Sequence, residues 1–310
     1  MPFFCDTINF ILEHPPFVIV GLFLLMNVNT EISNAFNRQA KQYEQSAIMP
    51  HEIGLRLFER LDYLKIEPQW ILDLGCGPGY FSKRLKKKYP QATVVGFDLA
   101  FQMLKEAKAK QSFLNKWPLL NGDMSVMPFT AELFDLVFAN QVIHWSPAWP
   151  TLMNELNRVM KVNGCLMFST LGPDTFCEIK EAWSGVDEHA HANDFIDMHH
   201  IGDYLLAHDF LDPVVDMEYL TAHYESAHHL VTALKAQGVR NINQQRRRGL
   251  TGSSAWNAFL EKLSASKTPQ GKVPLTYEVY YGHAWKGEAR QRTKGTDTFV
   301  PLSQLKRNTL

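Results

Sequence analysis

Two carboxylates and three glycines stand at spacings suited to binding a small charged ligand. Asp73 closes a short apolar run, and glycines follow it at alternate positions, Gly75, Gly77 and Gly79. Glycine lets a backbone pass close to a ligand at φ values that other residues resist. The second carboxylate, Asp98, comes 19 residues after Gly79. A carboxylate at that distance can accept hydrogen bonds from both hydroxyls of a ribose.

The glycine spacing argues against a dinucleotide as the ligand. A dinucleotide-binding loop has the pattern G-x-G-x-x-G, and here Tyr80 occupies the place of its third glycine. Asp73 also puts negative charge where a polyphosphate would be repelled and an ammonium group attracted. The loop resembles motif I of the class I S-adenosylmethionine (SAM)-dependent methyltransferases. A glycine turn without a ligand is the alternative.

Alternating strand and helix patterns must position this loop. We expect buried strands over 70–74, 92–97, 134–139 and 165–170, with helices over 80–88, 100–112 and 148–161. Such alternation predicts an α/β, doubly wound parallel sheet that binds ligands at the carboxyl edge of its strands. The methyltransferase resemblance implies seven strands and a Rossmann-like fold. It places the sixth strand near 213–220, the antiparallel seventh near 275–282, and a helical, substrate-selecting insertion at about 221–272.

Further candidates for the donor site follow the other strands. Asp123 and Met124 can hold an adenine, although a plain turn competes. Asp98 can also cap the helix that follows it, and the same geometry allows both roles. Asn140 emerges from the carboxyl end of the fourth strand. The predicted SAM site comprises Asp73, Gly75, Cys76, Gly77, Gly79, Asp98, Leu99, Asp123, Met124 and Asn140.

Composition excludes several classes of function. Hydrophobic residues make up 45% and charged residues 20% of the 310 residues, which is ordinary for a globular protein. A formal charge of −1 argues against a globally basic nucleic-acid-binding protein. The four cysteines lack metal or redox spacing and predict reduced thiols in a cytoplasmic protein. Adjacent histidines such as His199 and His200 cannot both face one ion, so no metal site is expected.

The two ends of the chain have a different character. The apolar run at 17–26 is too short to span a bilayer, and no basic residue precedes it as in a secretory signal. We interpret residues 1–28 as an extension, either disordered or upstream of a true start at Met26; a membrane anchor is the alternative. The methyltransferase domain is expected over 29–290, with a polar tail at 291–310.

Six further segments resemble one family, the malonyl-acyl carrier protein O-methyltransferases of biotin synthesis, over about residues 30–285. They are 35–44, 142–145, 168–174, 191–193, 234–238 with 249–252, and 274–278. Asn37, where the family usually has glycine, and the N-terminal extension depart from the pattern. The resemblance implies that the enzyme methylates the free carboxylate of malonyl-acyl carrier protein with SAM. Fatty-acid synthesis can then extend the methyl ester toward pimelate and biotin.

This reaction needs little from acid–base groups. A sulfonium leaves as a neutral thioether, and a carboxylate with a pKa near ~4 is already ionised at pH 7. What remains is positioning and the exclusion of water. We expect Tyr43, His144 and Trp145 to wall the site and donate hydrogen bonds, and Arg38 or a guanidinium of the insertion to hold the carboxylate. Tyr43 and Trp145 can instead be core aromatics, and Arg38 a surface ion-pair partner.

Basic residues gather in the expected insertion. We predict that this cluster receives the acidic carrier protein, although a solvated loop is the alternative; it comprises Lys235, Arg240, Arg246, Arg247 and Arg248. Neither nucleic acid nor membrane is expected as a partner. Two other functions stay open: a small-molecule methyltransferase, acting on a quinone precursor or a free carboxylic acid, and a non-catalytic SAM-binding scaffold. The former would need a closed apolar pocket without a basic rim.

Overall fold

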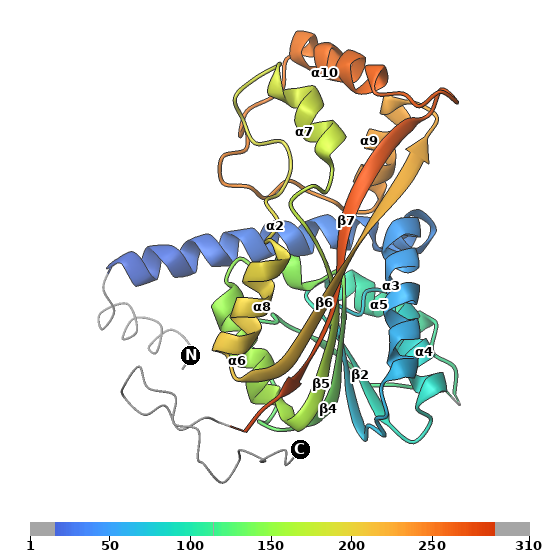
Figure 1. Cartoon of the computed structure of the whole chain (residues 1–310), viewed down its shortest axis with the longest axis vertical. Helices are drawn as coiled ribbons and strands as arrows, with labels where there is room; N and C mark the ends of the chain where they lie inside the picture. Colours follow the sequence, from blue (N-terminus) through green and yellow to red (C-terminus); the bar gives the residue numbers. More distant parts are fainter. Residues whose placement is uncertain (1–15, 114, 289–310) are drawn as a thin grey trace, which may run out of the picture.

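One seven-stranded sheet runs through the computed structural model, which describes residues 16–113 and 115–288 (Figure 1). The strand order is β3-β2-β1-β4-β5-β7-β6. Strands β1 to β5 pair in parallel, and β7 is antiparallel to both β5 and β6. The strands are β1 (Trp70–Leu74), β2 (Thr93–Asp98), β3 (Leu119–Asn121), β4 (Phe134–Asn140), β5 (Met160–Leu171), β6 (Phe210–Tyr224) and β7 (Val273–Lys286). This order confirms the predicted doubly wound sheet and the Rossmann-like fold of class I methyltransferases.

Helices cover both faces of the sheet. On one face, Leu57 and Leu85 bring α3 and α4 into a core cluster with the apolar strand residues. On the other face, Leu156 and Leu205 do the same for α6 and α8. The helices are α2 (Pro16–Ser46), α3 (Ile48–Arg60), α4 (Tyr80–Lys88), α5 (Phe101–Ala109), α6 (Trp149–Val159), α7 (Cys177–Ser184), α8 (Met198–Ala207), α9 (Ala227–Ala236) and α10 (Ser253–Ala265). Because strands such as β4 are buried on both faces, their sequences are apolar almost throughout.

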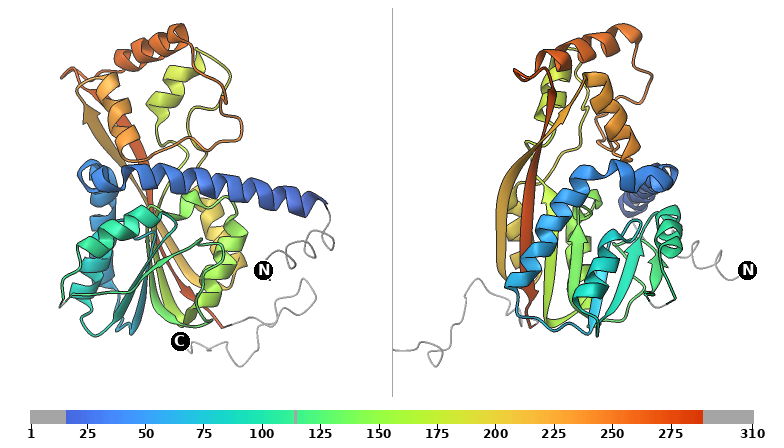
Figure 2. Two further views of the ribbon diagram at one scale, coloured as in Figure 1. Left: turned by 180° about the vertical axis from the view of Figure 1, so that it is seen from behind. Right: turned by 90° about the vertical axis from the view of Figure 1, so that its right-hand side faces the viewer.

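The N-terminal helix α2 differs from the prediction. It is one continuous helix over Pro16–Ser46, so residues 16–28 are helical rather than disordered, whereas residues 1–15 lie outside the described part. Once residues after 28 are held against the fold, each added helical residue gains a hydrogen bond without a new nucleation step. In Figures 1 and 2, α2 lies across the sheet, between the lower part of the sheet and the helices α7, α9 and α10.

Two other boundaries were also predicted wrongly. Helix α6 ends at Val159, and Asn163, with φ 63°, lies inside β5 rather than at the end of the helix. A register shift between Phe134 and Leu136 accommodates the residues of β5 around it. Strand β6 continues to Tyr224, so the insertion before the last strand spans 225–272 and not 221–272. Because its outward-facing side chains are polar, the sequence pattern did not show how far this edge strand extends.

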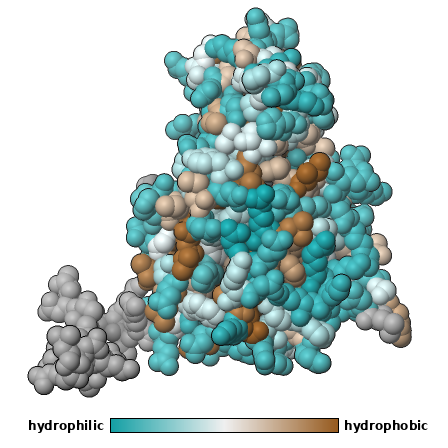
Figure 3. Space-filling view, turned by 45° about the vertical axis from the view of Figure 1, so that its right-hand side comes forward, coloured by the Kyte–Doolittle hydropathy of each residue, from teal (hydrophilic) through white to brown (hydrophobic). Residues whose placement is uncertain are grey.

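The long ribbon of β6 and β7 carries a second, smaller group of elements, which we call the cap. It comprises α7, α9, α10 and the segments 186–197 and 237–252, gathered beyond α2 in Figure 1. Aromatic packing holds the cap together, with Trp183 stacked on Phe259 at 4.4 Å between ring centroids. The face seen in Figure 3 is largely hydrophilic, with apolar side chains in small separate patches. Among the described residues, no helix has both the length and the apolar character needed to cross a bilayer.

Candidate active site

The glycine loop lies at the carboxyl end of β1, where the sequence placed it. Gly75, Gly77 and Gly79 have φ values of 66°, 52° and 78°, in the left-handed region that other residues rarely adopt. Gly75 and Gly77 line a cavity, the first cavity, that opens over the edge of the sheet. A Cβ added at Gly77 would meet only the Tyr43 ring, at 4.0 Å. The loop therefore leaves room beside its backbone for a ligand.

Asp98 ends β2 and lines the same cavity. One carboxylate oxygen accepts a hydrogen bond from the Gly77 amide at 2.8 Å, and the other accepts one from the Ala100 amide at 2.7 Å. Asp98 is not the cap of the following helix: Ala100 is the N-cap of α5, and the Gln102 amide of its first turn donates to the Asn37 side chain at 2.8 Å. Burial raises the pKa of Asp98 to about 6. Each oxygen retains a lone pair that a ribose hydroxyl can use.

Asp73 lies behind the loop rather than in the cavity. It is 2% exposed and accepts a hydrogen bond from the Ser82 hydroxyl, and it is not among the lining residues. Burial raises the pKa of Asp73 to about 7. Cys76 and Gly79 also lie outside the lining. The structure therefore gives Asp73 a place under the loop, and the predicted direct contact with an ammonium group is without geometric support.

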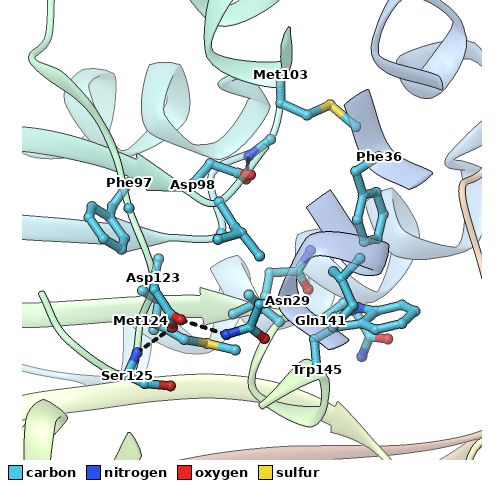
Figure 4. Close-up of a pocket in the computed structure, with 18 of the residues that line it drawn as sticks. Asn29, Phe36, Phe97, Asp98, Met103, Asp123, Met124, Ser125, Gln141 and Trp145 are labelled. Atoms are coloured by element: carbon cyan, nitrogen blue, oxygen red, sulfur yellow. Dashed lines mark hydrogen bonds between the residues drawn. The ribbon is translucent and has the colours of Figure 1, made fainter. Parts of the chain in front are cut away.

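Asp123 and Met124 line the end of the first cavity away from Phe36 and Trp145 (Figure 4), and Leu99 is a further lining residue. Asp123 accepts from the Ser125 amide at 2.8 Å, which is the turn that competed with a binding role. Its other oxygen accepts from the Asn29 side-chain amide at 2.5 Å. Asp123 thus forms a turn and also lines the cavity, and its contact with adenine stays a prediction.

Helix α2 contributes lining residues that sequence reasoning missed. Asn29, Ile32 and Phe36 line the first cavity beside Tyr43. Phe36 falls in the segment 35–44 that carries the family resemblance, and that was the one signal that could have found it. Asn29 lies in the stretch interpreted as the start of the domain. The helix closes the cavity from above only because the chain folds back over the sheet.

The end of β4 supplies two more lining residues, Asn140 and Gln141. The Asn140 amide donates to the Pro50 carbonyl at 3.0 Å, and its oxygen accepts from the Ser169 hydroxyl at 2.7 Å. Asn140 therefore fixes the wall rather than offering free hydrogen-bonding groups. Gln141, with φ 54°, adopts a left-handed conformation that is unusual outside glycine and recurs at functional sites.

A second cavity adjoins the first and shares four lining residues with it, Phe36, Tyr43, Gln141 and Trp145. Phe36 packs edge-on against Trp145 at 5.3 Å and lies 6.1 Å from Tyr43, measured between ring centroids. These aromatic rings form the common wall that was predicted for Tyr43 and Trp145. No Lys, Arg, Asp or Glu lines the second cavity.

His144 lines the second cavity only. Its ring lies 5.4 Å from that of Trp145 and 5.6 Å from that of Phe195. Burial lowers the pKa of His144 to about 3, so the imidazole is neutral at physiological pH. Burial, together with the charge of Asp98, raises the pKa of Tyr43, which keeps its hydroxyl protonated. Both residues can therefore donate hydrogen bonds without carrying charge.

The cations that we predicted near the substrate lie elsewhere. Arg38 is exposed on α2 and lines neither cavity, because the face of the helix that turns toward the sheet carries Phe36 and Tyr43 instead. Arg246 pairs with Glu31 of α2 at 2.7 Å, and Arg247 lies 3.6 Å from the Asp187 carboxylate. Arg248 is exposed. The predicted cluster is thus divided: Arg246 ties the cap to α2, and Arg247 pairs within the cap.

Lys235 and Arg240 are separate from those arginines. Both line a third cavity, inside the cap, and both are exposed at its rim. The Lys235 ammonium lies 5.6 Å from the centroid of the Trp256 ring. Sequence spacing alone put all five basic residues together, whereas the fold separates them into a rim pair and a loop group.

Comparisons with known proteins agree with this geometry. Residues 72–168 match the family described as a methyltransferase domain. Among solved structures, the YcgJ protein of Bacillus subtilis is similar in fold, with a TM-score of 0.55 and 14% identity, covering 75% of this chain and 98% of that one. At that identity the similarity concerns the fold alone.

Two curated relatives are similar over nearly their whole length. The malonyl-[acyl-carrier protein] O-methyltransferase of Legionella pneumophila is 58% identical over 280 residues, which is 90% of this chain and 99% of the relative. The protein of the same name from Gallionella capsiferriformans is 42% identical, over 84% of this chain and 92% of the relative. Identity of this extent, on the fold and site described, shows that the chain belongs to the malonyl-[acyl-carrier protein] O-methyltransferase family.

Proposed function

We propose that this protein transfers the methyl group of SAM to the free carboxylate of malonyl-acyl carrier protein. The product would be the methyl ester that fatty-acid synthesis extends toward pimelate and biotin. One observation carries the proposal: the first cavity and an uncharged second cavity share a wall made of Phe36, Tyr43 and Trp145. A donor in the first cavity and an acceptor in the second would lie next to each other beside these shared aromatic rings, shielded from water.

SAM, the methyl donor of this family, fits the first cavity. Asp98 has lone pairs for a ribose, Asp123 and Met124 line the end suited to adenine, and Gly77 leaves the backbone open to the ligand. SAM supplies an electrophilic methyl group whose departure from sulfur leaves a neutral thioether. The residues of the chain have to bind and orient the two reactants and to exclude water.

Neutral groups suit the acceptor side. A cation beside the malonyl carboxylate would lower its nucleophilicity and would also repel the sulfonium of the donor. Tyr43, Gln141 and His144 can donate hydrogen bonds to a carboxylate without either effect. No general base is needed, because the carboxylate is already ionised at neutral pH.

The exposed cations of the cap support a carrier protein as the partner. Arg240 and Arg248 are both exposed on the cap, and Arg240 directly follows Val239, which lines the second cavity. A small-molecule enzyme with a closed apolar pocket would not need such a rim. A cytoplasmic location is part of the proposal, supported by free thiols at Cys76 and Cys165.

Mass spectrometry tests the proposal directly. The purified protein, incubated with SAM and malonyl-acyl carrier protein, should add one methyl group to the malonyl moiety, and base hydrolysis should remove it as methanol. Holo carrier protein without malonyl is the matched control and should gain nothing. Methylation of free malonate at an equal kcat/KM, or no methylation of the carrier-bound group, would contradict the proposal.

A further inference from the structure

The third cavity lies within the cap, between α7, α9 and α10. Its volume is about 280 Å³, against about 60 Å³ for the second cavity. Aromatic rings form much of its wall, including Trp183 and Trp256. None of the residues that line the first cavity lines this one, so SAM bound there would leave it free.

The three cavities follow one another through shared walls. The second and third cavities have Phe176, Asn193 and Val239 in common. The second and first have four residues in common, among them Tyr43 and Trp145. The second cavity therefore lies between the cap and the first cavity. A long, narrow ligand that begins at the surface of the cap would follow this line to the methyl-donor site.

The series of cavities differs in charge between its end at the surface of the cap and its end at the methyl-donor site. Lys235 and Arg240 line the third cavity, and neither forms an ion pair with any residue in the described ranges. No Asp or Glu lines the cavity. Leu250, which is 95% exposed, precedes the lining residue Thr251. A ligand suited to these features has an anionic group at the rim, a slender apolar and amide body, and a reactive group at its inner end.

We propose that the third cavity binds the phosphopantetheine arm of the carrier protein and guides its malonyl end into the second cavity. The inference rests on the proposed function. The phosphodiester would lie at the rim by Lys235 and Arg240, and the arm would pass Trp183 and Trp256. Coenzyme A has the same arm, but only a carrier protein would also cover the exposed Leu250 beside the rim.

Cysteine protection tests occupancy without relying on catalysis. Val231 lines the third cavity from α9, whereas Val214, on the edge strand β6, is 52% exposed and lines none of the three cavities. In Val231→Cys, holo carrier protein whose terminal thiol has first been capped as a thioether, at about ten times its Kd, should slow alkylation by iodoacetamide about tenfold, by mass action. Apo carrier protein, which lacks the arm, should slow it far less. Neither form should protect the matched control, Val214→Cys.

Site-resolved mass spectrometry of the alkylated peptides reads each thiol separately. If the thiol at position 231 reacts too slowly, Thr251→Cys, at the exposed rim, takes its place in the same comparison. Equal protection by apo and holo carrier would mean that the arm lies elsewhere. Protection by the holo form alone, in an enzyme that does not methylate malonyl-carrier protein, would keep the arm site and overturn the proposed function.

Kinetics supply a second, independent readout. Val231→Trp should raise KM for malonyl-carrier protein about tenfold or more by filling the cavity, with SAM affinity unchanged. Lys235→Gln with Arg240→Gln should raise KM several-fold, and more at low salt, because these charges are exposed. Lys65→Gln with Lys87→Gln, exposed lysines remote from the cap, is the matched control. Unchanged KM in both cavity variants would contradict the inference.

Discussion

Asn29 donates a hydrogen bond to Asp123 across 2.5 Å, joining the middle of α2 to the turn after β3 (Figure 4). The two residues are 94 positions apart in the chain. This bond fixes α2, the helix that closes the first cavity, to Asp123, the residue predicted to bind adenine. Binding of SAM and the placement of α2 are therefore expected to depend on each other.

Removing this bond should weaken SAM binding. In Asn29→Ala, a hydrogen bond to a charged group is lost, which costs roughly 1.5–3 kcal/mol where the group is buried and less at this partly exposed site. We expect a several-fold rise in the Kd for SAM by calorimetry. Asn34→Ala, an exposed change on the same helix, is the control and should bind normally. An unaltered Kd for Asn29→Ala would separate α2 from donor binding.

The affinity for SAM should depend on pH through Asp98. Because the pKa of Asp98 in the free enzyme is about 6, the carboxylate gains a proton as the pH falls through 6 and loses its strongest acceptor character. The Kd for SAM should therefore rise between pH 7 and pH 5. Asp98→Asn should bind more weakly at every pH and show a flatter profile. Equal pH dependence in both proteins would assign the titration to another group.

Asp73 should influence stability rather than donor binding alone. Its pKa is about 7 in the folded state, against 3.8 for an ordinary aspartate, so the folded protein holds an extra proton between these pH values. The protonated Asp73 carboxyl stabilises the folded state fully below about pH 4, and this stabilisation is lost as the pH rises through 7. Each unit by which the pKa is raised corresponds to about 1.4 kcal/mol in the free energy of unfolding. Asp73→Asn should retain the hydrogen bond from Ser82. Because asparagine does not titrate, the free energy of unfolding of the variant should lack this fall with rising pH. Urea unfolding of both proteins at pH 5 and pH 8 measures the difference.

His144 should act by position and not as a base. Burial lowers its pKa to about 3, so it is neutral over the working range and has no titration near pH 6.5 to contribute. His144→Asn should lower kcat and leave the shape of the pH–rate profile unchanged. A change in rate with an apparent pKa near 6.5, present in the wild type and absent from the variant, would mean that His144 takes a proton.

Among the loop arginines, Arg248 should contribute most to carrier recruitment. Arg246 and Arg247 are engaged with Glu31 and Asp187, whereas Arg248 is exposed. Arg248→Glu should raise KM for malonyl-carrier protein, most at low salt, since such attraction is screened over about 8 Å at physiological ionic strength. A short malonyl thioester without phosphate should be methylated as before. Lys65→Glu, remote from the cap, controls for net charge; an equal effect there would make the change non-specific.

The local pattern of the sequence determined the central sheet and the glycine loop. Apolar runs that end in Asp73 and Asp98, separated by a helix, leave little choice of topology, because parallel strands need crossover helices. The left-handed glycines needed no tertiary information either. Residues 35–44 and 142–145 pointed, through family resemblance, to residues that line the cavities, although not to which ring faces which cavity.

Tertiary structure decided what the site contains beyond this loop. Asn29 and Phe36 enter it only because α2 crosses the edge of the sheet, and no local pattern encodes where a helix docks. The same holds for the cations: Arg38 faces solvent, Arg246 pairs with a residue 215 positions away, and Lys235 with Arg240 lines a cavity formed by the cap. Charge and spacing along a chain indicate which residues can interact, whereas long-range packing selects the pairs that do.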